Sequence, residues 1–167
     1  LKQLSKLAKS IKKNGTVACL QIAHMGAQGN THYTGERVVG PSSYIVPDIG
    51  IEAEVLTIEE IKQIEDEYVD GIVQADAAGF DLIEIMTAHG YLIHQFLSEH
   101  TNKREDEYGG SEKNRLRFLK NILDKVKNKV DTSRFAAKVT GNDFLPKGLD
   151  FKKIKFLIDM LDNYNFA

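Results

Sequence analysis

Four side chains that could bind or protonate a polar ligand lie in or directly after apolar segments of this sequence. Gln21 lies near the end of "TVACLQIA", and Lys138 lies within "FAAKV". His89 and Tyr91 follow the apolar segment "FDLIEIM". A buried amide or ammonium group costs free energy unless it has a partner. An imidazole and a phenol can each donate a hydrogen bond, and the phenol is protonated at pH 7 because its ordinary pKa is about 10. These four residues are therefore candidates for a ligand site.

Each candidate also has a structural explanation, and the residues alone leave both open. Lys138 could be an edge lysine whose ammonium group reaches solvent, Tyr91 could pack beneath its loop, and His89 could be a surface histidine. Gln21 needs hydrogen-bond partners in either case. A metal site is not predicted, because His89 and His94 have no cysteine partner and do not follow the His-Glu-x-x-His spacing of zinc enzymes.

The segments that carry these residues alternate between predicted helices and strands. Apolar residues at helical spacing predict a first helix that stops at Asn14-Gly15, and Thr57 with Glu60 forms a capping box that opens a second. Helices are expected before residue 14, from 57 to about 78, from 111 to about 129 and over 150–164. Strands are expected over 17–22, 80–86 and 134–139, with no element over the polar stretch 23–56. This alternation is typical of a parallel sheet, whose ligands bind beyond the carboxyl ends of its strands.

Composition excludes several classes of function. The chain has 167 residues, of which 42% are hydrophobic, and this suffices for one domain with one core. Its net charge of −2 offers no basic surface, so we expect neither a nucleic-acid partner nor a membrane. The single cysteine, Cys19, is expected to be a buried thiol on a strand covered on both faces, which favours a reducing, cytoplasmic location. A homo-oligomer remains open.

A long run of residues resembles one enzyme family. "GFDLIEIMTAHGYLIHQFLSEHTNKREDEYGGSEKNRLRFL" is similar to the signature of the old yellow enzymes, FMN-dependent (β/α)8 barrels that include ene reductases and dienoyl-CoA reductases. "ACLQIAHMG" resembles the third barrel strand of that family and "AAKVTGNDFLPKGLD" the fifth. A complete barrel has eight strands in roughly 250 residues. The resemblance therefore implies that residues 1–167 are a single segment of an FMN-binding TIM barrel, an incomplete barrel with the third to fifth strands and their helices.

The resemblance also implies roles for the candidate residues. Gln21 matches a residue that hydrogen-bonds the pyrimidine side of the flavin, and Lys138 stands where the family usually has an arginine near flavin N1 and O2. Tyr91 matches the tyrosine that protonates the substrate carbon opposite the hydride. His89 matches the second of two side chains that hydrogen-bond the substrate carbonyl oxygen. The first of that pair, usually histidine, is Met86 here, and a thioether cannot donate a hydrogen bond.

Met86 makes the chain resemble the dienoyl-CoA reductases, whose barrel is joined to domains with an iron–sulfur cluster and FAD; any such domains would lie outside this chain. The expected function is an FMN-dependent oxidoreductase that passes hydride from NAD(P)H through flavin to an activated alkene, of enone or enoyl/dienoyl type. The alternative is a non-catalytic barrel fragment that acts only through protein association, and the isolated fragment is expected to be inactive. Arg104, Asp106 and Arg115 are expected to form an ion-pair network that braces the loop behind His89.

Overall fold

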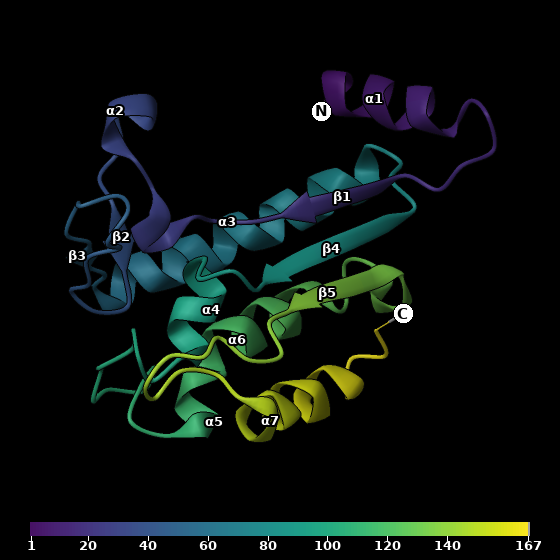
Figure 1. The fold of residues 1–167 in the computed structure, drawn as a ribbon. Coiled ribbons are helices and arrows are strands. Elements are labelled where there is room, and N and C mark those ends of the chain that lie inside the picture. Colours follow the sequence, from purple (N-terminus) through teal and green to yellow (C-terminus); the bar gives the residue numbers. More distant parts are fainter. Residues whose placement is uncertain (167) are drawn as a thin grey trace.

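Three strand segments pair into one parallel sheet, because their apolar side chains share one face. The computed structural model describes residues 1–166, and its sheet contains β1 (Cys19–Ile22), β4 (Leu82–Thr87) and β5 (Phe135–Val139) in the order β1-β4-β5. All neighbouring strands are parallel. Figure 1 shows the three arrows side by side and pointing the same way. The α/β class and the order of the strands agree with the sequence prediction.

Helices cover one face of this sheet. The long helices are α3 (Ile58–Ala77), α6 (Arg117–Val126) and α7 (Phe151–Asp162). Ile83, Ile85 and Phe135 point into the core that these helices form with the sheet, and all three are fully buried. Helix α1 (Lys2–Lys12) forms a separate small cluster, in which Ala8 packs with Phe80 at the amino end of β4. The core therefore lies on the outer, helical side of the sheet (Figure 1).

Local capping fixes where the helices begin. The side chain of Thr57 accepts a hydrogen bond from the Glu60 N–H, and the Glu60 side chain accepts one from the Thr57 N–H, so the predicted capping box is present at the start of α3. The side chain of Ser111 caps α5 (Glu112–Arg115) by accepting a hydrogen bond from the Asn114 N–H. The single helix expected from 111 to about 129 is instead divided into α5 and α6 and ends earlier, although the Leu116 N–H still donates to Glu112 O at the junction (3.1 Å).

The stretch from 23 to 56 contains elements that its sequence did not predict. They are a 3₁₀ turn η1 (Gly26–Gln28), a short helix α2 (Thr31–Thr34) and two very short parallel strands, β2 (Val39–Gly40) and β3 (Glu54–Val55). A fifth unpredicted element, α4 (Leu92–Leu97), follows β4, and all of its residues are buried. Short elements of this kind carry no periodic pattern, because their stability comes from contacts with distant residues.

The inner face of the sheet, opposite the face that the helices cover, contradicts two expectations. Cys19 and Gln21 on β1 are exposed, and so is Lys138 on β5, so the predictions that strand 17–22 is covered on both faces and that Cys19 is buried are wrong. Side chains alternate along a strand, and only the outer set meets the helices. Among residues 1–166, no helix is both long and apolar enough to cross a membrane.

The loop behind His89 is braced, though not with all the predicted partners. Arg104 pairs with Asp106 (2.6 Å) and also donates to two backbone carbonyls, those of Pro41 and Leu56. Arg115 does not join this pair; its nearest carboxylate is that of Glu99, at 3.9 Å. One guanidinium group therefore ties the charged loop to the 23–56 stretch, because its planar fork offers several donors.

Candidate functional site

The inner face of the sheet places Gln21 and Lys138 on the two strands that flank β4. Gln21 lies opposite Glu84, and Met86 lies opposite Lys138. Residues opposite each other in a parallel sheet point to the same face, so all four side chains share it. With strand spacings of about 4.8 Å and a rise of about 3.3 Å per residue, the Cα atoms of Gln21 and Lys138 are roughly 12 Å apart.

The Gln21 amide donates to the carboxylate of Glu84, a residue that sequence reasoning missed. The signal was present, since a carboxylate within "FDLIEIM" is as costly on a buried strand as the lysine within "FAAKV". The ammonium group of Lys138 forms no ion pair with any of residues 1–166. The face therefore offers the Lys138 ammonium group, and the oxygen and second N–H of the Gln21 amide, to a polar planar ligand.

The turn after β4 brings His89 to the same end of the sheet. Thr87 closes the strand, and its hydroxyl donates to the carbonyl of Lys138 (2.6 Å), which ties the ends of β4 and β5 together. His89 has a left-handed backbone with φ of 59°. Its N–H donates to the Thr140 hydroxyl (3.1 Å), and its carbonyl accepts from the Gln28 amide (2.6 Å).

Tyr91 lies at the beginning of α4, two residues beyond His89. It is the N-cap residue of this helix, with an extended backbone, and its N–H donates to Ala88 O (3.2 Å). The next N–H, that of Leu92, donates to His24 O in the loop after β1 (2.9 Å). Tyr91 is half-buried. The phenol is thus carried by a segment whose backbone is anchored to a neighbouring strand loop.

Gln95 is a second residue that sequence reasoning missed. Its side chain is 1% exposed, and every polar atom has a partner. Its amide nitrogen donates to the carbonyls of Gly90 (2.6 Å) and Met25 (3.2 Å), and its oxygen accepts from the Ala27 N–H (3.1 Å). A satisfied buried amide rigidifies the backbone that it bridges. Gln95 therefore holds the His89–Tyr91 turn against the loop that follows Gln21, and a polar residue within the apolar run "LIHQFL" was its only signal.

A cavity of about 280 Å³ opens beside His89. Its walls come from the 23–56 stretch, the turn and helix after β4, and the loop after β5, and its lining includes Gln28, Tyr44, His89, His94, His100, Thr140, Asp143 and Leu145. His94 Nε2 lies 3.3 Å from Asp143 Oδ2, and both side chains are almost fully buried. Burial lowers the pKa of His94, although the neighbouring Asp143 acts in the opposite direction. The cavity is therefore lined by a neutral histidine rather than a cation near pH 7.

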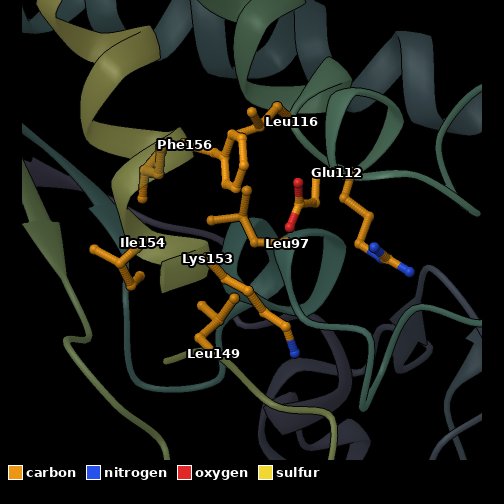
Figure 2. A pocket seen from close by; sticks show the side chains of 9 residues that line it. Leu97, Glu112, Leu116, Leu149, Lys153, Ile154 and Phe156 are labelled. Carbon is orange, nitrogen blue, oxygen red and sulfur yellow. The ribbon is translucent and has the colours of Figure 1, made fainter. Parts of the chain in front are cut away.

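Another hollow lies on the outer side of the sheet and is not a ligand site. Figure 2 shows Leu97, Leu116 and Phe156 facing one another between α4, α5 and α7, with Glu112 and Lys153 at the rim. Its cavity volume is only about 20 Å³, close to the minimum that holds one water molecule. It is a packing gap between helices.

The comparisons with known proteins agree with this geometry. A family model described as the NADH:flavin oxidoreductase / NADH oxidase family matches residues 1–165. An NADPH dehydrogenase of Bacillus licheniformis is 41% identical over 147 residues, which are 88% of this chain and 42% of that protein. An NADPH dehydrogenase of Bacillus subtilis is 39% identical over 146 residues, 87% of this chain and 42% of that protein. The chain thus spans less than half the length of these curated relatives.

Solved structures show the same relationship. The old yellow enzyme homologue from Zymomonas mobilis superimposes with a TM-score of 0.87 at 28% identity, covering 99% of this chain and 50% of that one. A 2-naphthoyl-CoA reductase superimposes with a TM-score of 0.90 at 28% identity, covering 96% of this chain and 26% of that one. The old yellow enzymes are TIM barrels, which confirms the predicted fold class, and FMN and NAD(P)H are the cofactors of the family, as predicted. Because the family model extends over nearly all of its residues, this chain belongs to the NADH:flavin oxidoreductase / NADH oxidase family.

Proposed function

We propose that residues 1–167 are one segment of an FMN-binding TIM barrel in a longer flavoenzyme. This enzyme passes hydride from NAD(P)H through FMN to an activated alkene, of enone or enoyl/dienoyl type. One observation carries the proposal. Gln21 and Lys138 share the uncovered face of the sheet, at the same end as His89 and Tyr91. In TIM-barrel enzymes, ligands bind at this carboxyl end.

The residues on this face fit a flavin ring. The Gln21 amide is held by Glu84, which leaves its oxygen and one N–H for the polar edge of a ring. Lys138 carries a positive charge without a partner among the described residues. When bound, FMN supplies the capacity to accept a hydride from NAD(P)H and to pass it to an alkene carbon. With FMN bound, Lys138 would stabilise negative charge on the pyrimidine side of the ring, although without the bidentate geometry of an arginine.

His89 and Tyr91 act on the substrate. The His89 imidazole donates a hydrogen bond to the carbonyl oxygen of the substrate and so polarises the conjugated double bond. Tyr91 donates its phenolic proton to the alkene carbon next to that carbonyl, while the other alkene carbon receives the hydride. Met86 is 5% exposed and carries no hydrogen-bond donor. His89 is therefore the one donor of the family's usual pair that this chain retains.

Met86 and one structural relative favour a thioester substrate. The dienoyl-CoA reductases share the methionine, and the 2-naphthoyl-CoA reductase was solved with 2-naphthoyl-CoA. An enoyl or dienoyl thioester has the same carbonyl conjugated to an alkene that His89 would polarise. In that branch, an iron–sulfur cluster and FAD would lie in domains outside residues 1–167. The cytoplasmic location and the homo-oligomer stay predictions.

Replacement of Tyr91 by Phe in the full-length enzyme tests this function. The two half-reactions are followed separately in anaerobic stopped-flow experiments through the flavin absorbance. Reduction of the flavin by NADPH needs no general acid, so its rate should change less than 2-fold. Reoxidation by 2-cyclohexen-1-one, a simple enone, should slow by roughly 10²–10⁴-fold. Equal slowing of both half-reactions would remove Tyr91 from the role of proton donor.

The exposed inner face favours a second candidate for the chain in isolation, a fragment that acts only through protein association. Cys19, Gln21 and Lys138 are exposed there, and β1 and β5 each have one unpaired edge among the described residues. Unpaired strand edges promote pairing with another chain. Sedimentation and FMN titration of residues 1–167 distinguish the two. Self-association without flavin binding supports the fragment, whereas a monomer that binds FMN with micromolar affinity contradicts it.

A further inference from the structure

His89 adopts a backbone conformation that histidine rarely takes. Its φ of 59° lies in the left-handed region, and it is the only non-glycine residue of β4 and the turn after it with a positive φ. For a non-glycine residue this conformation is unfavourable, so it persists only where the surroundings hold it. Backbone strain of this kind is common at functional sites, and the imidazole that it presents lines the 280 Å³ cavity.

Two side chains from neighbouring strand loops hold both peptide groups of His89. Thr140, beyond β5, accepts from the His89 N–H at 3.1 Å. Gln28, beyond β1, donates to the His89 carbonyl at 2.6 Å. Neither bond belongs to a helix or a strand, so the backbone of His89 depends on these side chains for its orientation.

The position of Gln28 is itself constrained. A Cβ atom on Gly90 would clash with Gln28 Nε2, so the close approach of this amide to the turn requires glycine at position 90. Gly90 also has a positive φ of 72°. Thr140 lies two residues beyond Lys138 on the chain. The carbonyl of Lys138 accepts a hydrogen bond from the Thr87 hydroxyl. The position of His89 is thereby coupled to β1 and to the strand that carries the lysine.

We propose that Gln28 and Thr140 are positioning residues that fix the His89 imidazole toward the carbonyl oxygen of the substrate. This inference rests on the proposed function, because it assigns His89 its substrate contact. Both side chains also line the cavity, but each is inferred to act by keeping the His89 backbone left-handed. Without one of these hydrogen bonds, the His89 backbone relaxes toward conformations with a negative φ. The imidazole then no longer points into the cavity.

The test uses the full-length holoenzyme with the variants Gln28→Leu and Thr140→Val, which remove the hydrogen bond and nearly preserve the shape. One neutral hydrogen bond contributes about 0.5–1.5 kcal/mol, so each variant should slow reoxidation by 2-cyclohexen-1-one by roughly 3- to 10-fold. Flavin reduction by NADPH should stay within 2-fold. Thr140→Ser keeps the hydroxyl and should restore the rate to within 2-fold of the wild type.

A double-mutant cycle separates positioning from general structural damage. In a His89→Ala background, Gln28→Leu and Thr140→Val should change the reoxidation rate by less than 2-fold, since no imidazole remains to be positioned. If they still slow reoxidation 3-fold or more, they do not act through His89, and the inference is overturned.

Amide hydrogen exchange supplies a readout that needs no turnover. The His89 N–H should be protected in the wild type, and Thr140→Val should accelerate its exchange at least about 5-fold, while Thr140→Ser should not. Unchanged exchange in Thr140→Val would refute the positioning role whatever the activity shows. If Thr140→Val accelerates the exchange but the wild-type enzyme does not reduce the enone, the hydrogen bond from His89 to Thr140 is supported and the proposed function is wrong.

Discussion

Helices α3 and α6 are joined by a buried carboxylate, and removing its cation should measurably destabilise the fold. Glu65 on α3 is 1% exposed. Its oxygens meet the Lys125 ammonium group (2.9 Å), the Tyr108 hydroxyl (3.0 Å) and the Asn121 amide (2.8 Å). Burial and the nearby Glu65 both raise the pKa of Tyr108, so the phenol stays a neutral donor. Among residues 1–166, Lys125 is thus the one positive charge paired with this carboxylate.

The variant Lys125→Met keeps the aliphatic stem and removes the charge. Breaking a fully buried ion pair costs about 3–5 kcal/mol. The Lys125 side chain is 36% exposed, so solvent screens part of the interaction, and Tyr108 and Asn121 still solvate the carboxylate. We expect a loss of about 2 kcal/mol in the free energy of unfolding.

Urea unfolding of the full-length protein, followed by circular dichroism, measures this loss. The matched control is Lys155→Met, because Lys155 pairs with Asp159 on the surface of α7, where both side chains are exposed. Such a pair contributes less than about 0.5 kcal/mol. If Lys125→Met and the control destabilise the protein equally, the buried carboxylate does not depend on its lysine and the reasoning fails.

Two further predictions concern single side chains near the site. Burial lowers the pKa of His94 below its ordinary 6.5, so the unfolded chain binds a proton that the folded one rejects. The free energy of unfolding should therefore fall as the pH drops from 7.5 toward 5. In urea unfolding, His94→Gln should weaken this pH dependence but not abolish it, because burial also lowers the pKa of His24. An unchanged pH dependence in His94→Gln would contradict the role given to His94. Met86→His restores the first donor of the family's pair and should speed reoxidation by 2-cyclohexen-1-one about 3-fold or more, as one added hydrogen bond allows. A slower reaction with an intact fold would show that the methionine is suited to this site.

The elements that sequence predicted well are those with a local cause. The capping box of Thr57 and Glu60 and the apolar periods of the long helices are local, and α3 begins where they placed it. The strands alternate with helices, so the order and direction of the sheet followed from connection rules alone. Gln21 and Lys138 were selected because buried polar groups on apolar strands are costly, but both lie on the exposed inner face, and their roles stay predictions.

The rest depended on contacts across long sequence distances. The strands β2 and β3 have two residues each. They are held by backbone hydrogen bonds such as the one from the Glu54 N–H to Val38 O, which no local sequence pattern predicts. Cys19 was misplaced because an apolar strand does not reveal which of its faces is covered. Gln28 gave no signal at all, since its role exists only once the loop after β1 meets the turn after β4.

The central claim is that the inner face of this sheet binds the flavin ring beside Lys138. The reduction potential of FMN in the full-length Lys138→Met variant tests it most directly, with Lys152→Met, on the exposed surface of α7, as the control. We propose that Lys138 stabilises the negative charge of the reduced ring, so its loss should lower the two-electron potential by about 30 mV or more, equivalent to about 1.4 kcal/mol. The control should match the wild type. A potential and an FMN content that are both unchanged in Lys138→Met would show that the flavin does not lie on this face.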